Sequence, residues 1–318
     1  MRGDFMIKEI NTLSVYDNNV EIYAIITNAT NGKTNGANKT AYMSFTFQDR
    51  TGCIDAKLWN AKQEQIETFV SGVVVLVKGD VIKYAESIQM KIASIEVYST
   101  SQEEQVKYLK SAPISLEKIE EEIKYYINKI ENKDMYQITD LLFNQHVDKF
   151  LVYPAASRNH HEYVSGLAHH IVGMLKVAES LVAIYPSLNQ SYLYAGIILH
   201  DLGKLVELSS PVLPEYTVEG KLLGHISIAS AMIKSAAEQL GIDNENSTIL
   251  MHMVLSHHGK LEFGSPVLPL IREAEVISII DNLDARINMI DKALENVEEG
   301  SFTKRMFPLE NRSFYKPK

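Results

Sequence analysis

The stretch LYAGIILHDLGK, at Leu193–Lys204, places an apolar helix directly before a histidine and an aspartate. Its first residues have the pattern of a buried helix, and Gly203 is a typical helix-ending residue. The imidazole of His200 and the carboxylate of Asp201 can turn towards one cation, and the carboxylate can bridge to a second. Divalent ions such as Mn²⁺, Fe²⁺, Co²⁺ and Zn²⁺ suit this pair better than Ca²⁺. Alone, such a pair is weak evidence, because two such residues often meet by chance.

The distribution of histidine strengthens the metal hypothesis. All ten histidines lie between His146 and His258, with none in the first 145 residues or the last 60. A helical bundle could point ligands from several helices into one cavity. For any single histidine, a packed core position is the better interpretation, but a shared site is better when five predicted helices each offer a ligand. The further ligand-type residues are His169-His170, His225, His257-His258 and Asp281.

From about Val152 onward the chain shows helical periodicity. Apolar residues at spacings of three and four, with helix-starting and helix-ending residues, predict five helices. These cover Leu167–Val182, Leu193–His200, Leu222–Gly241, Ser247–His258 with Ser247 as N-cap, and about Pro269–Val297. Ser209–Tyr216 contains two prolines and predicts a loop or short hairpin beside the site. A further helical pattern at Ser115–Leu142 follows a polar linker at about Ser99–Gln105.

The first 100 residues instead show strand patterns, rich in β-branched and aromatic residues. Five short strands in about 100 residues are typical of a small closed barrel. The predicted strands lie at Glu21–Asn28, Ala41–Gln48, Ile54–Trp59, about Val73–Lys78 and about Ile88–Val97. A turn-forming tract at Asn28–Asn38 separates the first two.

Alternation in two of these strands divides the side chains between the barrel interior and its surface. Tyr42, Lys57 and Trp59 are expected on the outer surface. An exposed Trp and Tyr beside a lysine would form a stacking platform for the bases of a single strand. The alternative is that Trp59 packs against the helical domain. The residues expected inside are Met43, Phe45, Phe47, Ile54, Ala56 and Leu58.

The composition is that of a soluble globular protein: 318 residues, 46% apolar and 22% charged, enough for about two domains. A single cysteine excludes an intrachain disulfide, and Met1–Thr12 contains no signal-peptide segment, so the cytosol is the expected location. No membrane-spanning segment is expected. The net charge of −9 argues against a polyanionic partner. The first 100 residues are nearly neutral, however, and two divalent cations would add four positive charges at the site.

The ligand order His…His-Asp…His…His…Asp resembles the HD superfamily of metal-dependent phosphohydrolases in its binuclear form. More specifically, the chain resembles the YhaM family of 3′-to-5′ exoribonucleases. The segment Gln48–Trp59 resembles that family's oligonucleotide-binding barrel, so the resemblance spans nearly the whole chain. Its other motifs are His160-His161-Glu-Tyr-Val-Ser-Gly-Leu followed by Ala-His169-His170, His200-Asp-Leu-Gly-Lys204, Gly224-His225-Ile, Ser256-His257-His258-Gly259 and Ile280-Asp281-Asn-Leu-Asp284-Ala.

The resemblance implies a multi-domain protein: an all-β oligonucleotide-binding (OB) barrel at 1–100, a helical linker region at 101–150 and an all-α HD bundle at 151–318. This chain has His169 where the family commonly has a glutamate, so His169 stays an alternative to His170. His252 lies outside the motifs and is expected to pack, and Asp284 is expected on the helix surface or behind a ligand. The implied metal ligands are His170, His200, Asp201, His225, one of His257 and His258, and Asp281.

The implied chemistry is phosphodiester hydrolysis. Two cations about 3.5–4 Å apart would activate a bridging water as hydroxide and offset the charge of the transition state. Asp201 is the candidate bridge. Lys204 would contact the phosphate, with a lysine that complements a helix C-terminus as the alternative. Arg158, His160 and His161 precede the first ligand helix and are candidates for binding phosphate or protonating the leaving oxygen.

The sequence therefore predicts a cytoplasmic, metal-dependent 3′-to-5′ exoribonuclease of single-stranded RNA with two divalent ions, Mn²⁺ first and Co²⁺, Fe²⁺ or Zn²⁺ as alternatives. Polarity, exonucleolytic action and RNA preference come from the resemblance alone. One alternative is an HD phosphohydrolase of small or cyclic nucleotides, which would give the barrel no task. Another is a non-catalytic single-strand-binding regulatory protein, against which the complete ligand set argues. Single-stranded DNA as a substrate and a homo-oligomeric state stay open.

Overall fold

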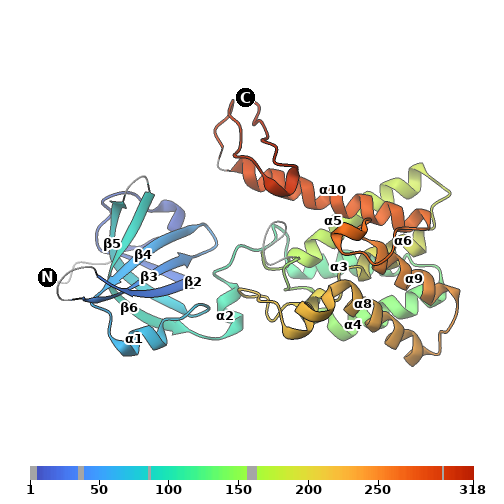
Figure 1. Ribbon diagram of the computed structural model, residues 1–318, viewed down its shortest axis with the longest axis horizontal. Coiled ribbons are helices and arrows are strands. Elements are labelled where there is room, and N and C mark those ends of the chain that lie inside the picture. Colours follow the sequence, from blue (N-terminus) through green and yellow to red (C-terminus); the bar gives the residue numbers. More distant parts are fainter. Residues whose placement is uncertain (1–5, 35–38, 85–86, 156–162, 296) are drawn as a thin grey trace. The chain divides into compact units, whose positions relative to one another are not determined.

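The computed structural model describes residues 6–34, 39–84, 87–155, 163–295 and 297–318. The chain divides into two compact units, Met1–Ser111 and Ala112–Lys318. All the strands of the described residues lie in the first unit, and the long helices lie in the second (Figure 1). The predicted order, a β-barrel followed by a helical bundle, is confirmed.

The first unit is a closed barrel. Its strand order is β1-β2-β3-β4-β6-β5, and a further pairing between β2 and β5 closes the sheet. The five predicted strands are confirmed, and β1 is an additional two-residue strand parallel to β2. The bounds are β1 Met6–Ile7, β2 Val20–Lys33, β3 Ala41–Gln48, β4 Cys53–Trp59, β5 Val74–Tyr84 and β6 Ser87–Ser99, with short helices α1 Gln63–Thr68 and α2 Gln102–Val106.

The β2 strand is longer than predicted. Its last residues, from Asn28 to Lys33, pair with β3, although this tract has the composition of a turn. Tyr42 explains part of this pairing, since its ring lies over Gly32: a Cβ there would meet the ring atoms at 2.7 Å. Pairing with a neighbouring strand and close packing outweigh the weak strand propensity of these residues.

The alternation predicted for β3 and β4 is confirmed. Across the ladder Phe45 faces Ala56, and both are at most 2% exposed. The outward pairs include Tyr42 with Trp59, the latter 44% exposed. Because the side-chain period of a strand is two, the same pairing that buries the core pairs sets the aromatic pair on the surface.

The second unit is all-α. Most helices lie close to their predicted positions, but Ser115–Leu142 divides into two helices between Asn128 and Asn132, whose side chain caps the second. The predicted N-cap Ser247 is wrong: Asn244 caps that helix, and Ser247 Oγ donates to the Asn244 carbonyl. The bounds are α3 Leu116–Ile127, α4 Lys133–Phe150, α5 Gly166–Ile184, α6 Gln190–Leu199, α7 Lys204–Glu207, α8 Val218–Leu240, α9 Glu245–Ser256 and α10 Arg272–Glu295.

The core of this unit forms around α5 and α6. From Leu193 to Leu199 every side chain of α6 is buried. Among the described residues, α5 is the one helix long and apolar enough to cross a membrane. Its Leu167, Ile171 and Leu175 are fully buried in the same core, as expected of a core helix that meets those criteria. The arrangement places the C-terminal ends of α6 and α9 and the middle of α10 around one cavity.

Candidate metal centre and nucleic-acid interface

The helical unit brings the predicted ligand residues together. Metal-binding groups form in three overlapping sets, within each of which the donor atoms lie at most 4.8 Å apart. These sets draw on five helices: α5, the end of α6, α8, the end of α9 and α10. The sets are His170, His200 and Asp201; His200, His257 and Asp281; and His225, His257 and His258.

Asp201 lies between the histidines. Its Oδ2 is 3.3 Å from His200 Nε2, while its Oδ1 is 3.4 Å from His225 Nε2 and 3.8 Å from His257 Nε2. Burial alone would raise the pKa of Asp201, but the charges of Lys204 and His200 outweigh it and hold this pKa well below its ordinary value. Asp201 is therefore an ionised carboxylate whose two oxygens face different histidines, as a bridging group requires.

Each imidazole of the cluster is held by its Nδ1, which lies within hydrogen-bonding distance of an oxygen acceptor. In a neutral imidazole with a protonated Nδ1, the other nitrogen, Nε2, keeps its lone pair for a metal. The acceptors are Asp284 for His170 at 2.6 Å, the Ile197 carbonyl for His200 at 2.7 Å, Glu207 for His225 at 3.2 Å, the Val254 carbonyl for His257 at 2.7 Å and the Phe263 carbonyl for His258 at 2.7 Å.

The donor set fits divalent cations. Within the described part of the chain, Nε2 of His200, His225 and His257 and Oδ1 of Asp201 are buried without a hydrogen-bond partner. Leaving a buried polar atom unsatisfied costs about 1–3 kcal/mol, so four at one point call for a ligand. Burial and the neighbouring His200 hold the pKa of His257 well below its ordinary value, which keeps this imidazole neutral and able to bind a metal.

Two glycines let the backbone adopt this arrangement. A Cβ on Gly203 would lie 2.0 Å from the backbone oxygen of His225, so only glycine allows the chain after α6 to approach α8 this closely. Gly224 interrupts α8 with φ 70° and ψ 151°, a region that is essentially restricted to glycine. The interruption immediately precedes His225 and turns that residue towards Asp201.

A cavity of about 490 Å³ opens beside the cluster. Lys204, the first residue of α7, reaches it and is only 8% exposed. Its Nζ donates a hydrogen bond of 2.6 Å to Asp201 Oδ2. The lining residues are Asp201, Lys204, His257, His258, Phe263, Ser278, Asp281, Asn282, Ala285, Met289 and Pro308.

The structure also bears on the histidines whose roles the sequence left open. His169 Nδ1 lies 2.7 Å from the Tyr163 hydroxyl and belongs to none of the three sets, so the structure favours His170. His252 Nε2 accepts a hydrogen bond from the Leu270 backbone, in line with the predicted packing role. Both His257 and His258 belong to the cluster. Arg158, His160 and His161 lie outside the described residues.

Two carboxylates form hydrogen bonds with candidate ligands, a role that the sequence predicts in part for one and not for the other. Asp284, predicted to lie on the helix surface or behind a ligand, holds His170. Glu207, for which the sequence predicts no role, holds His225: its Oε1 lies 3.0 Å from the His225 backbone N and 3.2 Å from Nδ1. Glu207 lies one helical turn after Lys204, so its position beside the motif was the only sign in the sequence.

On the barrel, the predicted surface residues form one group. The rings of Tyr42 and Trp59 have centroids 5.5 Å apart, and Lys57 Nζ lies 5.4 Å from each. Tyr84, at the end of β5, joins them with its ring 5.7 Å from the same Nζ. We call Tyr42, Lys57, Trp59 and Tyr84 the aromatic platform. It combines stacking faces with a cation, the two features of single-strand binding surfaces.

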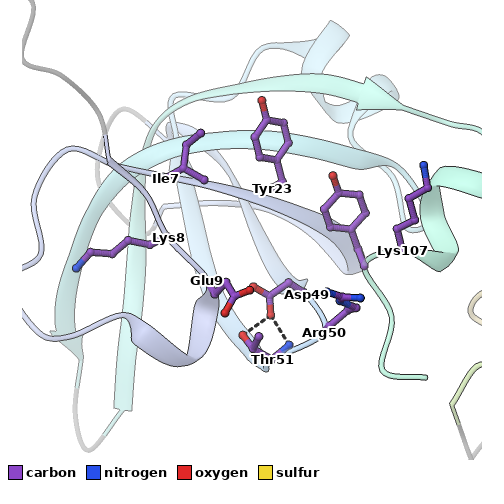
Figure 2. A pocket seen from close by; sticks show the side chains of 9 residues that line it. Ile7, Lys8, Glu9, Tyr23, Asp49, Arg50, Thr51 and Lys107 are labelled. Carbon is purple, nitrogen blue, oxygen red and sulfur yellow. Dashed lines mark hydrogen bonds between the residues drawn. The ribbon is translucent and has the colours of Figure 1, made fainter. Parts of the chain in front are cut away.

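A separate hollow of about 460 Å³ lies on the barrel unit, and Tyr23, Arg50 and Lys107 are among the residues that line it (Figure 2). Two of its three cationic side chains are already paired, Lys8 with Asp17 and Lys107 with Glu104. Asp49, at its floor, accepts hydrogen bonds from the turn that follows it. With its charges largely matched internally, this hollow is a weaker candidate for a nucleic-acid contact than the aromatic platform.

Known proteins match both units. The HD domain family model matches residues 167–286, and the OB-fold nucleic acid binding domain model matches residues 20–98. A protein named 3′-5′ exoribonuclease YhaM from Geobacillus sp. (strain WCH70) is 49% identical over 94% of this chain and 92% of its own length. The protein of that name from Bacillus subtilis (strain 168) is 47% identical over 94% and 95%. The match to a solved domain of replication protein A from Methanococcus maripaludis covers 30% of this chain and 97% of that domain, at 23% identity. Its TM-score is 0.25, a likeness too weak to bear on function.

Proposed function

Because the chain belongs to the YhaM family of 3′-5′ exoribonucleases, we propose that it removes nucleotides from the 3′ end of single-stranded RNA in the cytoplasm. It is a hydrolase with an HD domain and an OB-fold nucleic acid binding domain. The observation that carries the proposal is the convergence of five imidazoles with Asp201 and Asp281 beside one cavity.

We assign two divalent cations to this cluster, with Mn²⁺ as the proposed ion, because imidazole and carboxylate together suit such metals. When bound, two such cations supply Lewis-acid chemistry: they lower the pKa of a shared water and offset charge on the phosphate. Asp201 would contribute to both sites. The first site would use His170, His200, Asp201 and Asp281, and the second Asp201, His225, His257 and His258.

Around these ions the chain's own groups orient the reaction. Lys204 has three N–H donors, of which one is directed to Asp201, so the others can bind a phosphate oxygen in the cavity. The paired lysine also keeps Asp201 ionised. Glu207 and Asp284 hold His225 and His170 in one tautomer. Arg158, His160 and His161 remain our candidates for binding the substrate phosphate or protonating the leaving oxygen.

The barrel would select single strands. Stacking on Tyr42 and Trp59 requires bases that are not already stacked and paired in a duplex, and it is tolerant of base identity. Lys57 would then contact the backbone phosphate. A duplex offers only its edges and phosphates to such a surface, so single-stranded RNA is the preferred substrate, and single-stranded DNA could bind by the same contacts.

The function is tested by incubating the full chain with Mn²⁺, and separately with EDTA, in the presence of 5′-labelled RNA. We expect metal-dependent shortening of single-stranded RNA from its 3′ end, with duplex RNA and free nucleotides left intact. Hydrolysis of free or cyclic nucleotides alone would assign the centre to small molecules. No metal-dependent hydrolysis of any of these would make the chain a binding protein and end the proposal.

A further inference from the structure

The cavity beside the candidate metal centre continues beyond the ligands to an apolar end. One face of α10 forms a wall of this cavity, with lining residues spaced three or four apart. From Asp281 to Met289 the helix rises about 12 Å, at about 1.5 Å per residue. Pro308, in the C-terminal segment, lines the cavity with Met289, and Phe263 lines it from the loop after α9. The cavity thus offers both charged ligands and an apolar surface to one bound molecule.

Hydrogen bonds fix the loop that carries Phe263 to the candidate ligand His258. Its carbonyl accepts the 2.7 Å hydrogen bond from His258 Nδ1, and two residues later Ser265 Oγ accepts from the His258 backbone N at 3.1 Å. The Phe263 side chain is nevertheless 57% exposed. Lys260 Nζ lies 5.3 Å from its ring centroid. The loop therefore presents an aromatic face and a cation at a defined place beside the metal centre.

We propose that the Phe263 ring is the stacking site for the nucleobase of the 3′-terminal nucleotide. This inference rests on the proposed exoribonuclease function. Every nucleobase offers a π-face to an aromatic ring, so stacking binds the terminal residue whatever its identity. A ring that stays exposed in a cavity gains by covering its apolar surface with such a face. Binding without base discrimination is what an enzyme that shortens RNA of any sequence requires.

The size of the cavity favours the terminal nucleotide over an internal one. Sites for one small ligand span roughly 300–1,000 Å³, and this cavity is about 490 Å³. The phosphate to be cut must lie at the end formed by Asp201 and Asp281. The apolar end is then occupied by the nucleotide that is released, while the rest of the strand leaves through the mouth.

Product binding tests the stacking site without any turnover. Calorimetry on the full chain loaded with Mn²⁺ compares AMP with ribose 5-phosphate, which has the same sugar and phosphate but no base. We expect AMP to bind about 5- to 150-fold more tightly, the range of one base–aromatic stack. Phe263→Ala should lower AMP affinity to that of ribose 5-phosphate and leave the latter unchanged. Phe263→Tyr should keep the preference.

Phe307 provides the matched control. It is 89% exposed and precedes Pro308, but it does not line the cavity. Phe307→Ala should leave both affinities unchanged. Three results would each contradict the stacking site. These are no binding of AMP to the unsubstituted chain, equal affinities of that chain for AMP and ribose 5-phosphate, and a preference for AMP that survives Phe263→Ala. RNA hydrolysis separates the two proposals: a Phe263-dependent preference without hydrolysis removes only the exoribonuclease function, and hydrolysis with equal affinities removes only the stacking site.

Discussion

Glu207 accepts two hydrogen bonds from His225, one from the backbone N at 3.0 Å and one from Nδ1 at 3.2 Å. Burial alone would raise the pKa of Glu207, but the hydrogen bond from His225 outweighs it and lowers this pKa, so the carboxylate stays ionised. An ionised carboxylate can only accept, so Nδ1 carries a proton, and in the neutral imidazole the lone pair of Nε2 then lies towards Asp201. Glu207 does not line the cavity and is therefore a positioning residue for a candidate ligand.

Replacing Glu207 should weaken one metal site and spare the other. We expect Glu207→Ala to lower the affinity for one of the two cations by about 10- to 100-fold, the usual cost of removing a partner of a ligand histidine. Glu207→Gln keeps an acceptor oxygen and should restore part of the loss. Calorimetric titration with Mn²⁺ measures the affinities of both sites. Unchanged affinity in Glu207→Ala would contradict the positioning role.

Asp201→Asn should abolish RNA hydrolysis and leave single-strand binding largely intact. The amide keeps the volume of the carboxylate but removes the charge that faces His200, His225 and Lys204. Asparagine is preferred to alanine here, because alanine would leave Lys204 buried without any partner. Hydrolysis of end-labelled RNA and fluorescence anisotropy of a labelled strand give the two readouts. Normal turnover would exclude Asp201 as the shared ligand.

Metal binding should release a proton near neutral pH. Burial alone would lower the pKa of His170, but hydrogen bonds with Asp281 and Asp284 outweigh it and raise this pKa to about 9 in the metal-free chain. Because the pKa is raised, protonated His170 stabilises the metal-free fold, and this stabilisation is complete below pH 6.5, the ordinary pKa of the group. The stabilisation is lost as pH rises through about 9. A cation must displace that proton, so metal affinity should increase as pH rises from 6.5 to 9.

Calorimetry at pH 7.5 in buffers of different ionisation enthalpy measures the proton released. Asp284→Asn removes one of the two charges that hold the His170 proton, so it should reduce the number released. A binding heat that does not depend on the buffer would contradict the protonated state of His170.

The barrel and the ligand cluster could be predicted because both follow from short periods in the sequence. Alternation set Phe45 and Ala56 on one face of two neighbouring strands, and the ladder pairs them. His170 and Asp281 each stand beside the apolar stripe of a helix, and packing those stripes on one core brings the two side chains to within 3.2 Å of each other. A local sequence pattern is sufficient to predict the orientation of side chains where one face of a helix or strand must be buried.

Other features depend on segments that meet only in the folded chain. Ser247 has the expected chemistry of an N-cap, yet Asn244 takes that place because its side chain accepts from Asn246 N and its carbonyl accepts from Ser247. Glu207 acquires its role when α8 brings His225 back to it, and no period in the sequence marks that contact. The choice of His170 over His169 likewise depends on which face of α5 meets α10.

Gly203→Ala should disrupt the metal centre by a steric route. Its backbone is ordinary helical, with φ −61° and ψ −19°, so alanine would suit the local conformation. The added methyl would, however, lie 2.0 Å from the His225 carbonyl oxygen and force α8 away from Asp201. We expect a loss of about 1–3 kcal/mol in the free energy of unfolding, together with weaker metal binding. The matched control is Gly52→Ala, where the nearest side chain lies at 3.5 Å. Equal effects of the two substitutions would contradict the steric explanation.

Trp59→Ala should weaken binding of long RNA more than hydrolysis of very short RNA. Trp59 is 44% exposed and stands with Tyr42 beside Lys57, so its indole is available for a base. Loss of one stacked base should raise the dissociation constant of a long single strand by about 5- to 150-fold. A dinucleotide engages only the catalytic cavity, so its hydrolysis should not change. Anisotropy with EDTA present isolates binding from turnover.

The matched control for the indole is Tyr98→Ala, because Tyr98 is 52% exposed on the same barrel but its ring packs edge-on against Tyr23 rather than beside Lys57. We expect this variant to bind long RNA as the unsubstituted chain does. If Trp59→Ala and Tyr98→Ala weaken binding equally, exposed aromatic area on the barrel matters and the aromatic platform is not a specific site. If Trp59→Ala slows dinucleotide and long-RNA hydrolysis alike, the indole acts through the fold of the barrel and not by stacking.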